Sequence, residues 1–214
     1  EVDLQLVEQA ILCDLSYKEQ VTKRAYELSG LENPNSVSQL KGWLEEQGVF
    51  MDSLGKKEVT KHLKEADGEV LEMLKLRLLM SKTSVKKYQA IERCVCSDGR
   101  VHGLLQFYGA NRTGRWAGRL VQVQNLPQNK LKDLSLARTL VKEGRFETLD
   151  TLYDNVPGVL SELIRTAFVP KAGHQFIVAD FAAIEARVLA WLSGESWRLE
   201  VFEQGGDIYC ASAS

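Results

Sequence analysis

Apolar side chains in the first part of the chain recur mostly three or four positions apart. Between residues 2 and 31 they alternate with Glu and Lys, and this spacing predicts one or two helices. Gly30 and the turn-prone residues 33–35 end that segment, and Ser36 stands at the N-cap position of a second helix. A further helical pattern runs through residues 59–88, so about the first 90 residues are expected to be all-helical.

The second part of the chain mixes strand and helix patterns. Residues 101–108 are strand-prone and are followed by glycine-rich turns. Residues 176–179 are a compact apolar run between Gly173 and Asp180, which predicts a buried strand. Helical patterns return at residues 134–141, 159–167 and 184–192. The combination predicts an α+β fold.

Length and composition place the chain among globular proteins. Its 214 residues, 44% of them hydrophobic, suffice for one large domain or two small ones. No apolar run approaches the roughly 20 residues that cross a bilayer, and no basic-then-apolar leader opens the chain. We therefore expect a soluble cytoplasmic protein without a membrane partner. The start at Glu1 and the end within an apolar stretch suggest a piece of a longer protein.

The four cysteines contain no Cys-x-x-Cys pair and lie in apolar helix-like or strand-like patterns. Buried reduced thiols are therefore favoured over disulfides or zinc ligands. The three scattered histidines do not alter this expectation.

Positive charge is concentrated in one part of the sequence although the net charge is −2. Residues 75–130 contain eleven Lys or Arg against two acids, whereas the stretches on either side are net negative. Such a belt is typical of proteins that bind a phosphate backbone, because each neutralised phosphate releases condensed counterions. A solvated helix face is the alternative that charge alone leaves open.

An aspartate at the end of the second predicted strand is the main candidate for metal chemistry. The buried apolar run ends on Asp180, and a helix is expected to begin at once. A carboxylate held at a rigid strand end suits Mg²⁺, which prefers hard oxygen donors. A helix N-cap is the structural alternative for Asp180, and Glu185 by itself would be an ordinary surface acid.

The run from Asp180 to Arg187, Asp-Phe-Ala-Ala-Ile-Glu-Ala-Arg, resembles motif A of the family A (polymerase I type) DNA polymerases, usually Asp-Tyr-Ser-Gln-Ile-Glu-x-Arg. Thr113-Gly-Arg115, then eight residues, then Gln124-Asn-Leu-Pro127, is similar to the family's Thr-Gly-Arg…Gln-Asn-Ile-Pro signature. Weaker similarities at residues 33–44, 82–84 and 163–168 extend the resemblance over nearly the whole chain.

The resemblance implies a set of roles at the catalytic end. Asp180 would bind two catalytic Mg²⁺ ions, with the Phe181 carbonyl as a further ligand. Glu185 would lie over the incoming sugar and exclude a 2′-hydroxyl, and Arg187 would be structural. Tyr209, which stands where the family more often has His, would lie near the deoxynucleoside triphosphate. Ala182 and Ala183 replace the family's Ser and Gln, so polar contacts from those positions are missing.

The resemblance also implies contacts to primer–template DNA. Arg115 would enter the minor groove at the primer end and read acceptors that every base pair shares, while Gln124 and Asn125 add backbone or groove contacts. Lys82, Thr83 and Lys86 would grip duplex phosphates.

The implied organisation is a mostly helical thumb and thumb base in residues 1–100, followed in residues 101–214 by a partial palm with motif A and the start of the fingers. The expected function is that of a DNA-directed DNA polymerase fragment of phage or bacterial type, inactive alone because it lacks a second catalytic carboxylate and a triphosphate-binding helix. A non-enzymatic duplex-binding module is the alternative. A single-subunit RNA polymerase is disfavoured by Glu185 and by the paired motifs. Replication and repair remain equally open.

Overall fold

The computed structural model describes residues 1–82 and 85–213. Its backbone forms two compact units, Glu1–Lys171 and Ala172–Ser214. Thr83, a predicted DNA contact, lies outside the described residues.

The first unit is organised around one long helix, α1 (Leu4–Ser29), which the apolar spacing predicted. Asp3 is its N-cap, and the Asp3 side chain accepts a hydrogen bond from the Leu6 amide at 3.2 Å. Gly30 is its C-cap, in the left-handed region. At 1.5 Å per residue, 26 residues make a helix of about 39 Å.

Four further helices complete the all-helical part, as predicted: α2 (Val37–Glu46), α3 (Lys56–His62), α4 (Gly68–Met80) and α5 (Val85–Cys94). Ser36 is the N-cap residue of α2 in extended backbone, but its side chain makes no capping hydrogen bond. Its hydroxyl instead lies 3.1 Å from the Ser38 hydroxyl.

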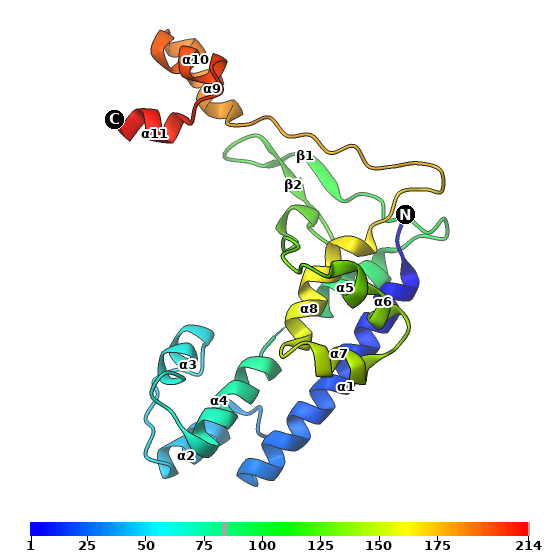
Figure 1. The fold of residues 1–214 in the computed structure, drawn as a ribbon, viewed down its shortest axis with the longest axis vertical. Helices are drawn as coiled ribbons and strands as arrows, with labels where there is room; N and C mark the ends of the chain where they lie inside the picture. The colour runs from blue at the N-terminus through cyan, green and yellow to red at the C-terminus, as the bar shows by residue number, and fades with distance from the viewer. Residues whose placement is uncertain (83–84, 214) are drawn as a thin grey trace. The chain divides into compact units, whose positions relative to one another are not determined.

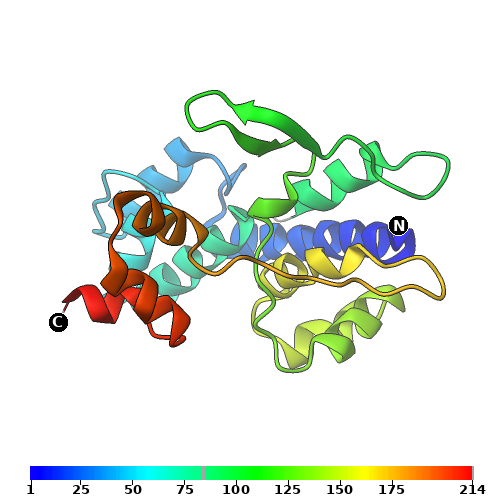
Figure 2. The same ribbon diagram turned by 90° about the horizontal axis from the view of Figure 1, so that it is seen from above.

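The second part of the first unit adds a small sheet and short helices. Strands β1 (Leu105–Ala110) and β2 (Arg115–Gly118) form an antiparallel hairpin with an irregularity between Gln106 and Ala110. The hairpin projects from the helices in both Figure 1 and Figure 2. The α+β prediction is therefore confirmed. The remaining elements are η1 (Val123–Asn125), α6 (Leu134–Lys142), α7 (Phe146–Leu152), α8 (Val156–Leu163) and η2 (Ile164–Ala167).

Two hydrophobic cores hold the first unit together, and α1 contributes side chains to both. Figure 1 shows the course of α1 along this unit. Its N-terminal half buries Leu6 and Val7 among side chains of α5, α6 and α8. Its C-terminal half buries Val21 and Ala25 against α2 and α4. Residues 1–100 and 101–171 thus share a core, and the assignment of residues 1–100 to a thumb and 101–214 to a partial palm stays a prediction.

The second unit contains α9 (Ile184–Ser193), α10 (Ser196–Glu203) and α11 (Ile208–Ala213). The helix predicted after Asp180 is present, but the buried strand predicted at residues 176–179 is wrong. That stretch has no regular secondary structure, and Ile177 and Val178 are 88% and 90% exposed. A strand requires a neighbour for its backbone hydrogen bonds, and no described residue pairs with this one.

The four cysteines differ in burial. Cys13 is buried and Cys94 is half-buried, whereas Cys96 and Cys210 are exposed. The expectation of buried thiols was therefore wrong for the last two. Among the described residues, no helix has both the length and the apolar character to cross a bilayer.

Candidate nucleic-acid interface

A basic groove of about 1120 Å³ lies in the described part of the first unit. Its lining residues come mainly from α3, α4, α5, α8 and the segment that follows η1. Two acids, Asp154 and Glu162, also line it. The groove nevertheless has a positive excess, because five lysines surround it: Lys56, Lys75, Lys82, Lys87 and Lys130.

Lys82 is the most constrained of these cations. It is half-buried, and its ammonium donates to Asn155 Oδ1 at 2.7 Å. Burial lowers the pKa of Lys82, and the nearby positive charge of Lys56 lowers it further. An anionic ligand in the groove would offset both effects, since it favours the charged form. Lys87 is also held in place, because it donates to the Val121 carbonyl at 3.0 Å.

The groove explains part of the charge belt seen in the sequence. Four belt lysines line it, but Lys86, a predicted phosphate contact on α5, is exposed and is not among the described lining residues. Lys56 was missed because it belongs to a net acidic stretch. The Lys56-Lys57 pair directly after Gly55 was the available local signal.

The Thr-Gly-Arg motif lies at the turn of the β1–β2 hairpin. Gly114 has φ +66°, and a Cβ there would lie 2.8 Å from Cε2 of Tyr108, so the turn geometry and the tyrosine ring both require glycine. Arg115 begins β2 and its side chain is exposed.

The end of β2 lies directly against the second motif. A Cβ at Gly118 would collide with the side-chain amide of Gln124 in η1. Asn125 donates from Nδ2 to Gln122 Oε1 at 3.0 Å and lines the basic groove. The fold therefore brings together the hairpin, Gln124 and Asn125, which sequence similarity had connected only by their order.

The predicted metal ligand Asp180 lies in the second unit, on the irregular stretch before α9. Its side chain is exposed. The N-cap of α9 is Ala183, at φ 53°, so the alternative of Asp180 as an N-cap is wrong. Phe181 is 79% exposed, and Glu185 lies in the first turn of α9 with an exposed side chain.

The carboxylate of Asp180 and the carbonyl of Phe181 are hard oxygen donors of the kind Mg²⁺ prefers, but Mg²⁺ requires a near-octahedral set. Among the described residues, Asp180 belongs to no group of three or more side chains with ligand atoms close together. The described residues around Asp180 therefore do not by themselves provide the ligand set that Mg²⁺ requires.

The other predicted residues of the second unit lie on its helices. Arg187 donates from Nε to the Ala182 carbonyl at 2.9 Å, and its guanidinium stacks 4.3 Å from the ring centre of Phe202. These contacts fix the start of α9. Tyr209, in α11, is 80% exposed.

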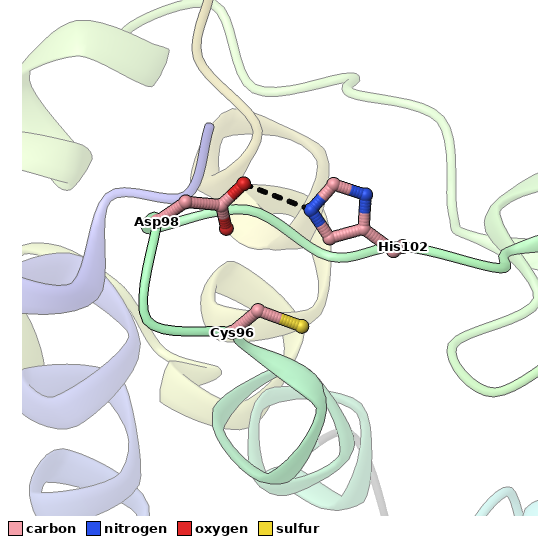
Figure 3. A group of neighbouring side chains, drawn as sticks. All are labelled: Cys96, Asp98 and His102. Atoms are coloured by element: carbon pink, nitrogen blue, oxygen red, sulfur yellow. Dashed lines mark hydrogen bonds and ion pairs between the residues drawn. The ribbon is translucent and has the colours of Figure 1, made fainter.

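Figure 3 shows a cluster that sequence reasoning did not identify, Cys96, Asp98 and His102, whose possible ligand atoms lie within 4.8 Å of one another. His102 Nε2 is 2.9 Å from Asp98 Oδ2, and the Arg100 amide donates to Asp98 Oδ1 at 3.1 Å. The hydrogen bond with His102 lowers the pKa of Asp98 most strongly. Burial, the next largest effect, raises it, and the Arg100 amide and the positive charges of His102 and Arg100 lower it further, so the net pKa is lowered. Since both carboxylate oxygens have protein partners, the turn accounts for the cluster without a metal.

Comparison with known proteins extends this description. A model of the family described as DNA polymerase family A matches residues 13–214. A DNA polymerase of Bacillus phage SP02 is 56% identical over the whole chain, which covers 33% of that protein. The thermostable DNA polymerase I of Thermus thermophilus is 39% identical over 36% of the chain, and DNA polymerase I of Chloroflexus aurantiacus is 35% identical over 54%. These matches cover 10% and 9% of the two bacterial proteins, so the chain spans a third or less of each of these relatives.

Proposed function

Since the chain belongs to DNA polymerase family A, we propose that it supplies a duplex-binding groove and part of the catalytic metal site of a DNA-directed DNA polymerase. The whole enzyme would extend a DNA primer on a template with deoxynucleoside triphosphates. The observation that carries the proposal is the groove with five lysines, bordered by Asn125 of the Gln-Asn-Leu-Pro motif. Lysines arranged along a groove can neutralise several duplex phosphates without reading sequence.

The positions of the residues support the contacts proposed for DNA. Lys82 lines the groove, and Lys86 extends the positive charge along α5. Arg115 is exposed on the hairpin, and Gln124 is exposed on η1. Both would contact the minor groove at the primer end. We also propose that Thr83 contacts a duplex phosphate, on the basis of sequence similarity alone.

The second unit would supply the reacting end of the site. Asp180 and the Phe181 carbonyl would be ligands of two Mg²⁺ ions, together with carboxylates from outside this chain. Bound magnesium would activate the primer 3′-hydroxyl and hold the triphosphate. Glu185 would exclude the 2′-hydroxyl of a ribonucleotide, and Tyr209 would lie near the triphosphate. Because the donor set is incomplete, the chain of 214 residues should incorporate no nucleotide by itself.

Duplex binding by this chain tests the proposal. The Kd for a labelled primer–template should rise about tenfold or more between roughly 50 and 200 mM salt, and it should not depend on sequence. Replacing Lys56 and Lys75 by Gln should reduce the slope of log K against log salt by about 2. Replacing Lys57 and Lys64, which are not among the described lining residues, is the matched control. A flat salt dependence would contradict the groove as a phosphate site.

A non-enzymatic duplex-binding module would show the same binding. Primer extension by the full-length protein separates the two functions, because only a polymerase incorporates nucleotides. Binding without incorporation would favour the module.

A further inference from the structure

One wall of the basic groove has no secondary structure of its own. Residues 127–131 follow η1 without forming helix or strand, and Pro127, Gln128 and Lys130 line the groove. Backbone amides and carbonyls in such a segment need partners from elsewhere, or their shape is not fixed.

Two side chains of the adjacent helical segment provide those partners. Arg165 donates from Nε to the Pro127 carbonyl and from Nη2 to the Leu126 carbonyl, both at 2.6 Å. Glu162 Oε2 accepts from the amides of Lys130 and Leu131 at 2.6 and 2.7 Å. One charged group thus holds the start of the wall, and the other holds its end.

The base that carries these two side chains is itself rigid. Helix α8 continues directly into η2, and Leu163, Ile164 and Ala167 are at most 1% exposed. The buried hydroxyl of Tyr88, from α5, donates to the Leu160 carbonyl at 2.6 Å. The two side chains that hold the wall are therefore anchored in the hydrophobic core that includes Leu163 and Ile164.

The charge of Glu162 makes its role informative. A carboxylate that lines a groove for phosphates opposes binding by Coulomb repulsion. Its two charge-assisted hydrogen bonds to backbone amides provide a reason for its presence that does not involve direct contact with DNA.

We propose that Arg165 and Glu162 are positioning residues, which hold residues 126–131 in the one conformation that presents Asn125, Gln128 and Lys130 together to duplex DNA. This inference rests on the proposed function of the groove. Arg165 is not among the described lining residues and acts through the carbonyls that it holds. Lysine cannot replace it, because two carbonyls are held by two N–H groups of one planar fork.

The sign of the effect of Glu162→Ala distinguishes positioning from simple electrostatics. Positioning predicts that the loss of two amide partners weakens primer–template binding about tenfold, although a negative charge has left the groove. Electrostatics alone predicts tighter binding. Asp154→Ala, which removes the other acid of the groove, is the matched control and should bind as tightly as the unmodified chain or more tightly. Glu162→Gln keeps a side-chain oxygen acceptor and should restore binding.

Arg165→Lys provides a second test because it keeps the charge. It should weaken binding about tenfold although the side chain keeps its positive charge, because one ammonium cannot hold both carbonyls as the planar guanidinium does. If Glu162→Ala does not fold, Arg165→Lys and Glu162→Gln decide the matter. Unchanged affinity in Arg165→Lys, or affinity in Glu162→Ala equal to or tighter than that of the unmodified chain, overturns the proposal.

Hydrogen exchange separates failure of this inference from failure of the proposed function. The amides of Lys130 and Leu131 should exchange faster in Glu162→Ala, whereas amides in α1 should not change. If the unmodified chain shows no salt-dependent DNA binding, the proposed function is wrong. The positioning role is then tested by the hydrogen-exchange rates alone. Unchanged exchange at Lys130 and Leu131 overturns it.

Discussion

The two units of this protein differ in how well their own residues support them. Unit Glu1–Lys171 buries many of its apolar side chains in two cores to which α1 contributes, although others, such as Phe50 and Phe107, are exposed. In the described part of unit Ala172–Ser214, only Ala190, Phe202 and Ile208 are buried. Apolar side chains such as Ile177, Val178 and Trp191 are 69–90% exposed there.

The difference matters because each unit carries one part of the proposed function. The groove and its lysines rest on a core that the first unit completes by itself. The Asp180 motif has the clearer sequence signature, but Asp180 itself lies on a stretch without regular secondary structure, and no strand among the described residues pairs with that stretch. A motif can therefore be easy to recognise in the sequence even when few neighbouring residues fix its geometry.

The largest expected effect concerns the second unit. In the full-length protein, Asp180→Ala should lower the rate of single-turnover incorporation at least a thousandfold, which is about 4 kcal/mol of transition-state stabilisation. The thermal midpoint and DNA binding should not change, since the side chain is exposed and caps no helix. Glu203→Ala, another exposed carboxylate of this unit, is the control. A destabilised but fully active Asp180→Ala enzyme would show that the metal-ligand role is wrong.

A matched pair of leucines tests the contrast in packing directly. Leu163→Ala, at a fully buried position, should reduce the free energy of unfolding by about 3 kcal/mol because it leaves a cavity. Leu192→Ala, where the side chain is 69% exposed, should change it by less than about 0.5 kcal/mol. Urea unfolding of both variants provides the measurement. Equal losses would contradict the difference between the units.

The next effect concerns the attachment of α6 to the start of α1. The Asp3 carboxylate accepts from Arg138, from Lys142 at 2.7 Å and from the Leu6 amide. Burial raises the pKa of Asp3, but the hydrogen bonds from Lys142 and Leu6 and the positive charges of Arg138 and Lys142 outweigh it, so the net pKa is lowered.

A lowered pKa in the folded state means that the stabilisation is complete above the unfolded-state pKa of about 3.9 and is lost as pH falls through the folded-state value. Asp3→Asn should therefore cost about 2 kcal/mol at about pH 7, and the difference from the unmodified chain should shrink below about pH 4. Urea midpoints at both pH values test this, with Glu8→Gln as the control. A difference that persists unchanged at low pH would exclude a role for the charge.

The smallest expected effect is one of selectivity. In the full-length protein, Glu185→Ala should reduce discrimination against ribonucleotides about tenfold, which corresponds to about 1.4 kcal/mol. Competition between the two sugar types in single-nucleotide extension measures it, and Glu200→Ala is the control. An unchanged ratio, with unchanged rates, would remove Glu185 from the sugar side of the site.

The sequence by itself determined the features that depend on near neighbours. Helix positions followed from apolar spacing, and Gly30 and Ser36 marked helix ends, because periodicity and capping involve residues only a few positions apart. The α+β class and the family followed in the same way from local motifs. The strand predicted at residues 176–179 failed because a strand depends on a distant partner, which no local pattern supplies.

Only the tertiary structure decided the shape of the groove. It brings Lys56 of α3 beside Lys82 and Lys130, although the stretch around Lys56 is acidic. It also shows that Arg165 and Glu162 hold the backbone of a segment more than thirty residues earlier. Such contacts form when helices pack on a shared core, and the burial of apolar faces places polar side chains beside one another without regard to their separation along the chain.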